Sequence, residues 1–242
     1  MTVAVYCSRP SESASLLVKA LRRQGMNARR VRRLDRLRDD DFVVNWGQRG
    51  LEALPYAGLN HRVPANKYEE LLLLAEHDIP VPAHSLFAME DFRGRTYHHS
   101  QGRDFLDPPS RFDYYVEWLD IAEEWRFHTA VDSEGPKVIR RARKVLREST
   151  GDAGEGRGGV IRAHAAGWVF SYAVDPEPPT GARALAKQAL ASTGCQFGAV
   201  DIAVTTGGRL VVLEFNSAPG FDAAGSTVDR YAAAIAAHAA AY

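Results

Sequence analysis

Cysteine is scarce in this sequence, which excludes a protein held together by a framework of disulfide bonds. Only Cys7 and Cys195 occur among 242 residues, far apart in the chain. Small secreted domains depend on several disulfides, whereas reduced thiols are typical of the cytosol. The N-terminus also lacks the basic flank and long apolar stretch of a signal peptide. We therefore expect a cytoplasmic protein.

The sequence also lacks a long apolar run and an excess of charge of one sign. No stretch approaches the roughly 20 apolar residues that a membrane helix needs. Lysine and arginine number 30, as do aspartate and glutamate, so net charge favours neither a membrane nor nucleic acid as partner. With 45% hydrophobic and 25% charged residues, the composition is that of a globular protein with a substantial core.

Periodicity and turn residues divide the chain near Pro64. Before Pro64 the pattern is strand, helix, strand, strand, which indicates a small parallel sheet. These elements are expected at 3–7, 11–24, 28–34 and 42–45. Beyond Pro64, helices are expected at 66–77, at 180–193 and from 226 onward. Strands are expected there at 85–87, 95–97, 113–119, 125–131, 137–145, 167–170 and in a hairpin over 197–216.

Two of these elements carry more detailed predictions. The buried stripe of the helix over 66–77 is expected to consist of Tyr68, Leu71, Leu72 and Ala75. The hairpin alternates in both strands, and Gly207 and Gly208 between them suit a two-residue turn with positive φ at both positions. One face of the hairpin would then hold its apolar residues, namely Val200, Ile202, Val204, Val211, Leu213 and Phe215.

The other face of the hairpin predicts a metal site. The expected turn places Asp201 directly opposite Glu214, with Asn216 on the same face. Two carboxylates this close repel each other, and a divalent cation removes the repulsion. Three hard oxygen donors suit Mg²⁺, which is usually completed by water and nucleotide phosphates. A polar, solvated sheet face would show the same spacing, and a register slip of one residue would exchange the two faces.

Three blocks of the sequence, in order, resemble the ATP-grasp superfamily. The block over 212–220 is similar to the family's E-x-N-x-x-P-G signature, and Asp201 upstream matches its first acidic metal ligand. The block over 114–128 resembles the family's adenine hinge followed by an E-x-R strand. The block over 45–82 resembles the family in its Asn-Trp-Gly turn, its Asn-Lys helix start and its closing proline-rich stop.

The resemblance implies an α+β fold in which two α+β lobes sandwich ATP. A short Rossmann-like α/β lobe would occupy 1–62, the central lobe 63–118, and the C-terminal lobe with the metal site 119–242. Arg143-Lys144 and the stretch over 162–170 are similar to the compact carboxylate–amine ligases of tailed phages. That subgroup implies the cytoplasm of a bacterium or of a phage-infected host.

The resemblance also implies an activity and its cofactors. ATP would convert a carboxylate into an acylphosphate, and an amine would displace phosphate to give an amide or peptide-like bond. The partners would be small-molecule or peptide substrates, without a membrane. Mg²⁺ would be held by Asp201, Glu214 and Asn216. Such phosphoryl transfer depends on positioning and on neutralised charge, which metal ions and basic side chains supply.

Nucleotide contacts follow by position from the resemblance. Lys67 would contact the α-phosphate, although an ordinary solvated helix lysine is the alternative. Glu117 and Leu119 would meet adenine through their backbone groups, with Trp118 between them. Glu124 would hold the ribose hydroxyls.

The transferring phosphate and the acyl intermediate need basic side chains. The candidates are Arg126, Lys144 and Arg162. Arg126 shares the polar face of its strand with Glu124, and a purely structural pair between these two is the alternative. His128 lies on the same face and is interpreted as a hydrogen-bonded structural group rather than a base.

The sequence departs from the family pattern in places, which leaves two other functions open. Many members carry a second phosphate-binding lysine before a flexible flap, and here Arg95 would replace it, with 100–102 as the flap. The chain could therefore bind ATP without ligating anything. The Gly-rich segment 149–159 is interpreted as a mobile substrate lid. The segment 22–38 contains eight arginines and could bind nucleic acid, although an ordinary solvated face is favoured.

Overall fold

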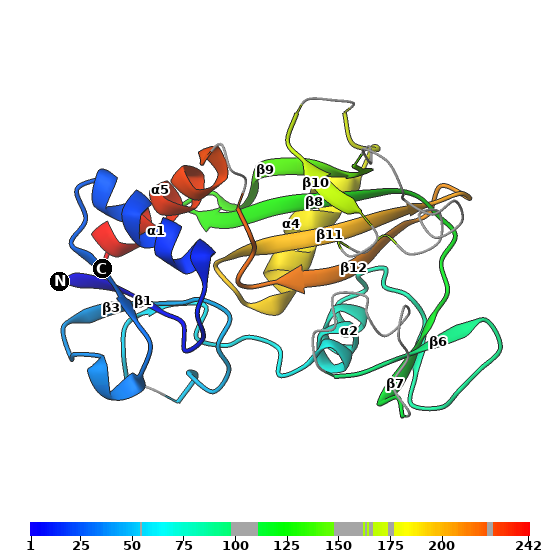
Figure 1. The fold of residues 1–242 in the computed structure, drawn as a ribbon, viewed down its shortest axis with the longest axis horizontal. Helices are drawn as coiled ribbons and strands as arrows, with labels where there is room; N and C mark the ends of the chain where they lie inside the picture. The colour runs from blue at the N-terminus through cyan, green and yellow to red at the C-terminus, as the bar shows by residue number, and fades with distance from the viewer. Residues whose placement is uncertain are drawn as a thin grey trace.

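Three β-sheets organise the computed structural model, which describes residues 1–53, 55–97, 111–147, 162, 164, 167–173, 177–221 and 225–242. In Figure 1 the first sheet lies at one end of the molecule, and β6 and β7 lie toward the other end. None of the described helices has both the length and the apolarity that crossing a membrane requires.

The first sheet is parallel and confirms the strand–helix–strand–strand order expected before Pro64. Its strand order is β2-β1-β3-β4, and a short 3-10 helix precedes β3. The elements are β1 (Thr2–Tyr6), α1 (Glu12–Arg23), β2 (Ala28–Val31), η1 (Leu34–Arg36), β3 (Asp41–Asn45) and β4 (Gly58–Leu59). The hydroxyl of Ser11 starts α1 by accepting a hydrogen bond from the Ala14 amide at 3.1 Å, as its position as N-cap predicts.

The large sheet is antiparallel, and its strand order is β10-β9-β8-β11-β12. Its strands are β8 (Ile121–Asp132), β9 (Gly135–Leu146), β10 (Trp168–Ser171), β11 (Phe197–Thr205) and β12 (Leu210–Asn216). One face packs against α4 (Ala182–Thr193), and alternate side chains of the strands bury themselves there. The other face packs against α5 at one end and carries polar groups farther along.

The small sheet has the order β5-β7-β6 and accompanies α2. These elements are β5 (His84–Ser85), β6 (Phe92–Arg95), β7 (Tyr114–Glu117) and α2 (Lys67–Glu76). The stripe expected for α2 is partly wrong, because its buried residues are Glu70, Leu71 and Leu74, whereas Leu72 is exposed. Tyr68 instead packs against Tyr114 at a ring distance of 5.3 Å.

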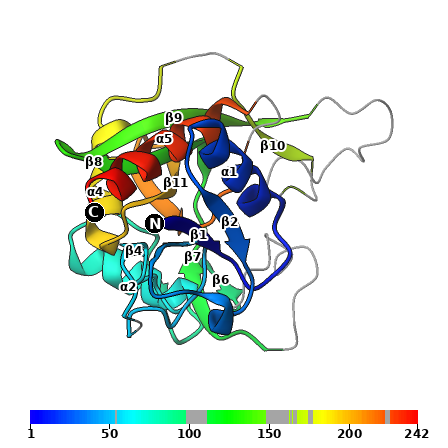
Figure 2. The same ribbon diagram turned by 90° about the vertical axis from the view of Figure 1, so that its left-hand side faces the viewer.

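The first sheet and the large sheet share a core through the last helix. Figures 1 and 2 show α5 (Ser226–Ala240) beside α1, and α5 also packs on β8 and β9. Trp46 after β3 stacks on Phe197 of β11 with ring centroids 5.5 Å apart. Asn60 adds a polar clamp at this junction: its side chain donates to the Phe197 carbonyl at 2.8 Å and accepts from the Gln196 amide at 2.7 Å.

Replacing Asn60 should destabilise this junction strongly. Asn60→Ala leaves the buried Phe197 carbonyl and the Gln196 amide without their partner, which is expected to cost about 2–4 kcal/mol of unfolding free energy. Urea denaturation measures the loss. Asn27→Ala is the matched control, because Asn27 makes an exposed hydrogen bond to Thr2. Equal losses in the two variants would contradict the role given to Asn60.

Candidate active site

The turn of the C-terminal hairpin differs from the expected one. The loop contains three residues, 206–208, closed by a hydrogen bond from the Thr205 amide to the Arg209 carbonyl at 2.9 Å. Of the two glycines only Gly208 has a positive φ, at 81°. The prediction of a two-residue turn is therefore wrong, and its register does not hold near the loop, where Val204 faces Leu210.

A β-bulge restores the predicted pairing farther along the hairpin. The register shifts between Asp201 and Ile202, which leaves Leu213 as the extra residue of β12. As a result Asp201 does face Glu214, as predicted, although by a different route. The bulge also changes the faces: Val212 enters the core, while Leu213 is only half-buried. The expected placement of Val211 and Leu213 on the core face is wrong.

The acidic face itself is confirmed. Val200, Ile202 and Phe215 lie in the core beside α4, so the alternating residues Asp201, Glu214 and Asn216 point to the opposite face. This is the face opposite α4, and Lys67 of α2 reaches it. The hairpin therefore presents oxygen donors where a ligand between the sheets would lie.

Arg126 neutralises Asp201. The two residues are register partners on β8 and β11, and the guanidinium donates from Nε to Oδ1 and from Nη2 to Oδ2, both at 2.7 Å. Burial lowers the pKa of Arg126, but the Asp201 carboxylate outweighs burial and holds that pKa above its ordinary value. A bidentate pair in a low-dielectric setting is a strong one. The alternative pair between Arg126 and Glu124 is not found.

Lys67 neutralises Glu214 from across the gap between α2 and the hairpin. Asn66 caps α2 by accepting a hydrogen bond from the Glu69 amide at 2.9 Å, which fixes Lys67 as the first helical residue. Its ammonium lies 2.6 Å from Oε2 of Glu214, and both side chains are about four-fifths buried. Lys67 is therefore not an ordinary solvated helix lysine.

A third ion pair lies on the same face of the large sheet, next to the pair of Arg126 and Asp201. Lys144 of β9 donates to Oε1 of Glu124 on β8 at 2.5 Å. Burial raises the pKa of Glu124 to about 7, and Lys144 opposes that rise. Phe170 of β10 covers the two cations: its ring centroid lies 4.0 Å from the Arg126 guanidinium and 5.1 Å from the Lys144 ammonium. Three cations and three carboxylates thus lie together on one face.

Glu70 belongs to this constellation, and sequence reasoning missed it. Its carboxylate, on the buried side of α2, accepts a hydrogen bond from the Phe215 amide at 2.7 Å. Burial raises its pKa to about 8, while the nearby Lys67 opposes the rise. In the sequence, the only indication is a glutamate at a core position of a Leu-rich helix. The partner of this glutamate is a backbone amide on β12, so its role is recognised only in the tertiary structure.

The remaining basic candidates are placed differently. Arg162 donates to the carbonyls of Ile121 and Ala122 at 2.7 and 2.9 Å and stacks over Trp168. These contacts anchor it at the start of β8, and no contact joins it to Arg126 or Lys144 within the described part of the chain. Arg95 ends β6, in register with Tyr114 of β7, so it lies on the small sheet rather than on the acidic face.

The predicted adenine hinge connects the small sheet to the large one. β7 ends at Glu117, two residues earlier than expected, and 118–120 lead into β8. The Glu117 amide already donates to the Ala83 carbonyl at 2.8 Å, and its carboxylate pairs with Arg209 at 2.7 Å. The Trp118 amide donates to Asp91, whereas Leu119 makes no hydrogen bond to any other described residue. Leu119 therefore remains the better donor for a ligand.

His128 is a buried, hydrogen-bonded group, in line with its structural interpretation. Tyr231 donates its hydroxyl hydrogen to the Gly198 carbonyl at 2.7 Å, so its oxygen accepts from Nδ1 of His128 at 3.1 Å. Nε2 lies 2.8 Å from the Tyr172 hydroxyl. The contact with Tyr231 thus places a proton on Nδ1, and both ring nitrogens are engaged within the fold.

The oxygen donors of the hairpin fit Mg²⁺ that arrives with a nucleotide. Among the described residues no three His, Cys, Asp or Glu side chains form a metal cluster, so a site made by such side chains alone is not supported. Asp201 and Glu214 offer two carboxylates, and Asn216 adds an amide oxygen that also accepts from the Ala218 amide at 3.0 Å. Mg²⁺ takes few protein ligands when phosphates supply the rest.

The arginines of segment 22–38 are largely engaged within the fold. Arg23 pairs with Asp229 at 2.6 Å, Arg33 with Asp35 at 2.8 Å, and Arg29 with Asp41 at 2.5 Å. Internal pairing of this kind is typical of an ordinary charged surface. The flap expected at 100–102 and the lid expected at 149–159 lie outside the described residues.

Neither a protein-family model nor a curated protein sequence matches the chain. Solved structures do match it. The ATP-grasp ligase PsnB, in complex with a minimal precursor, Mg and ADP, has a TM-score of 0.64 at 14% identity over 97% of this chain and 96% of its own. An N5-carboxyaminoimidazole synthetase from Staphylococcus aureus has a TM-score of 0.65 at 10% identity, over 98% and 77%.

A RimK domain ATP-grasp protein from Sphaerobacter thermophilus has a TM-score of 0.59 at 16% identity over 97% of this chain and 99% of its own. The chain has the ATP-grasp fold. The predicted α+β fold class is thereby confirmed over nearly the whole chain.

The raised pKa of Glu70 should make the protein less stable as pH rises. The folded carboxyl binds its proton up to about pH 8, whereas its ordinary pKa is 4.5, so only the unfolded chain releases the proton between these values. The contribution of Glu70 to stability is expected to be full below pH 4.5, to fall by on the order of 5 kcal/mol up to pH 8, and to level off above. Urea unfolding across this range measures the slope.

Glu70→Gln should flatten this part of the profile, because the neutral amide has no proton to lose. Glu76→Gln, on the exposed side of the same helix, is the matched control and should keep the slope of the native protein. If Glu70→Gln and Glu76→Gln give the same profile, the buried carboxyl is not responsible for the pH dependence.

Proposed function

We propose that this protein is an ATP- and Mg²⁺-dependent ligase that joins a carboxylate to an amine and releases ADP and phosphate. The observation that carries the proposal is the meeting of Lys67, Arg126 and Lys144 with acidic side chains on one face of an ATP-grasp sheet. Phosphates need such cations, and a metal needs such carboxylates. The fold supports ATP-dependent ligation in general; the residue roles rest on the geometry.

The proposed binding step is an exchange of partners. Without ligand, Arg126 and Lys67 satisfy Asp201 and Glu214. When a nucleotide enters, its phosphates become the partners of Arg126 and Lys67, and Asp201, Glu214 and Asn216 become free to hold Mg²⁺. Each carboxylate has a cation beside it before and after the exchange, so no buried carboxylate is left uncompensated. Mg²⁺ held by these residues would supply positive charge that neutralises the charge developing on the phosphates during transfer.

The proposed reaction has two steps. A carboxylate oxygen of the substrate attacks the γ-phosphorus of ATP, and the bond to ADP breaks. An amine nitrogen then attacks the acyl carbon, phosphate leaves, and the nitrogen loses a proton. Arg126 and Lys144, held near each other under Phe170, would bind the transferring phosphate. Their fixed positions avoid reorganisation when charge moves.

The rest of the predicted site is proposed on the same basis. Glu124 would bind the ribose hydroxyls, and the hinge at Glu117, Trp118 and Leu119 would meet adenine. Lys67 would contact the α-phosphate. Arg162, whose pKa burial lowers while the neighbouring Glu124 opposes the lowering, and Arg95 at the end of β6 would bind phosphate beside these residues. The lobe boundaries at 62 and 118 are proposed likewise.

The substrate class is proposed from the solved neighbours. PsnB was solved with a precursor peptide, and a carboxyaminoimidazole synthase with ADP and an aminoimidazole ribonucleotide. A small-molecule or peptide carboxylate and an amine are therefore proposed for this chain, which would act in the cytoplasm. Kinship with the compact phage ligases is part of the same proposal.

Turnover should depend on the two carboxylates of the hairpin. Pools of amino acids and short peptides, offered with Mg·ATP and hydroxylamine, are expected to give ADP and a hydroxamate, because hydroxylamine traps an acylphosphate. Asp201→Asn and Glu214→Gln should each lower ADP release by about 100-fold or more, since each removes a metal ligand and an anionic partner.

Asp132→Asn is the matched control, because Asp132 lies at the far end of β8 and pairs with Lys137. It should keep the native rate. Native-like turnover in Asp201→Asn would contradict the site. Calorimetric binding of Mg·ATP without hydroxamate from any pool would contradict ligation and leave a nucleotide-binding module.

A further inference from the structure

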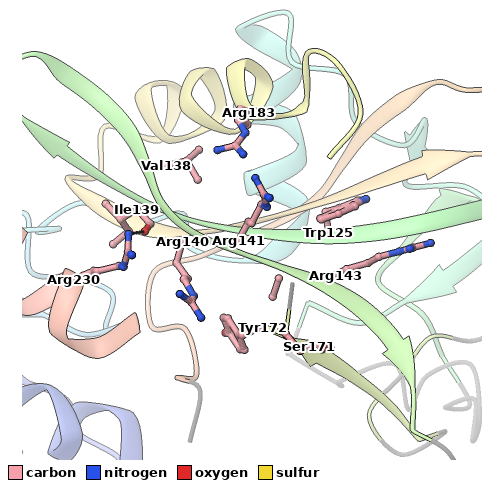
Figure 3. A pocket seen from close by; sticks show the side chains of 12 residues that line it. Trp125, Val138, Ile139, Arg140, Arg141, Arg143, Ser171, Tyr172, Arg183 and Arg230 are labelled. Carbon is pink, nitrogen blue, oxygen red and sulfur yellow. Dashed lines mark hydrogen bonds between the residues drawn. The ribbon is translucent and has the colours of Figure 1, made fainter. Parts of the chain in front are cut away.

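A pocket opens at the edge of the large sheet that lies opposite β12. β9 extends beyond β10, which pairs only with 143–146, so no described strand covers the outer edge of β9 over 137–142. Where β10 leaves β9 there is a cavity of 310 Å³. We call it the β9 notch, and it is lined by Arg140, Arg141, Arg143, Tyr172, Arg183 and Arg230 among others (Figure 3).

The β9 notch has an excess of positive charge. Five arginines line it, and none of its lining residues is acidic. Figure 3 shows Arg141 and Arg183 on the α4 side of β9 and Arg140 and Arg230 on the other side. The excess is local, because the chain as a whole has no net charge.

The arginines of the notch are only partly compensated. Arg143 pairs with Glu123 at 3.0 Å, and Arg230 donates to the Ile139 carbonyl at 2.6 Å. The half-buried side chain of Arg140 makes no hydrogen bond or ion pair with any described residue, and its Nε is buried without a partner. Its guanidinium lies 5.6 Å from the centroid of the Tyr172 ring. A buried Nε–H without an acceptor, on a cation that has no anionic partner among the described residues, favours a ligand that supplies an anion.

The chain itself shows which anion fits the rim of the notch. Arg141 donates from both terminal nitrogens to the two carboxylate oxygens of Glu177, each at 2.9 Å, and Arg183 donates to the same carboxylate at 2.8 Å. The Glu177 side chain is 72% exposed, so this carboxylate sits at the entrance rather than inside. The notch thus recognises a carboxylate in bidentate geometry.

We propose that the β9 notch binds an extended peptide segment carrying at least two acidic side chains. One carboxylate reaches Arg140 inside the notch, and a second displaces Glu177 from Arg141 and Arg183. The uncovered edge of β9 offers backbone groups to an extended chain, as in other strand-addition sites. A nucleic acid suits the notch less well, because its phosphates need a long basic surface and the notch is short and flanked by Glu123 and Glu177.

This site lies at the β9 edge of the large sheet, whereas the proposed metal site is at β12, and it does not require the proposed ligase activity. The probe is a fluorescein-labelled ten-residue peptide in which pairs of adjacent glutamates alternate with pairs of threonines, so that an extended chain presents carboxylates on both faces. Fluorescence anisotropy with the full chain measures binding. Arg140→Gln and Arg183→Gln are each expected to raise Kd about tenfold or more, since each removes a charge-assisted contact. Glu177→Gln should lower Kd, because it removes the competing carboxylate.

Arg33→Gln is the matched control: Arg33 is an exposed arginine of the first lobe paired with Asp35, and its loss should leave Kd unchanged. A peptide with glutamine in place of glutamate should not bind, and pyrophosphate or a single-stranded oligonucleotide should compete poorly. Arg183 is exposed at the start of α4, so that variant tests the site even if Arg140→Gln folds badly. Equal weakening by Arg33→Gln, no binding of the acidic peptide, or preference for the oligonucleotide would overturn the proposal.

Discussion

The ion pair between Asp201 and Arg126 is the interaction on which the rest of the site depends. Both side chains come from central strands of the large sheet, on the face that α4 does not cover, and both are largely withdrawn from water. A carboxylate in that position requires a cation, and a guanidinium there requires an anion. The neighbouring pairs of Lys67 with Glu214 and Lys144 with Glu124 repeat the same constraint. On this face each carboxylate is therefore paired with a cation of the protein. In the proposed complex, phosphates and a metal ion replace these partners.

Much of this arrangement is encoded locally and could be predicted. Alternation in β8, β11 and β12 determines which residues share a face, and the E-x-N-x-x-P-G segment identifies the hairpin that carries the proposed metal ligands. The sequence predicts Asp201 opposite Glu214 through a two-residue turn, which the structure does not contain. The three-residue loop shifts the strands by one position, and the bulge at Leu213 shifts them back. A bulge is stabilised by packing against neighbouring strands, so the hairpin sequence alone does not reveal it.

Other features depend on contacts between distant segments. Glu70 occupies a core position of α2 because the edge strand β12 presents an amide that needs an acceptor, and these two residues are 145 positions apart. The β9 notch exists because β10 is shorter than β9, which no periodicity in either strand indicates. The segment 22–38 is rich in arginine, yet Arg23, Arg29 and Arg33 are paired internally. By contrast, the Nε of Arg140, which lies outside that segment, is buried without a partner. Charge density along the chain is a poor guide to which charges lack partners in space.

The central claim is that Mg²⁺ and nucleotide phosphates together replace the cations that hold Asp201 and Glu214. A crystal structure with Mg²⁺ and a non-hydrolysable ATP analogue tests it most directly. The account predicts metal density in contact with Asp201 and Glu214, and the Arg126 guanidinium turned from Asp201 to a phosphate. A bound nucleotide with the Arg126–Asp201 and Lys67–Glu214 pairs intact, or a metal held elsewhere, would contradict it.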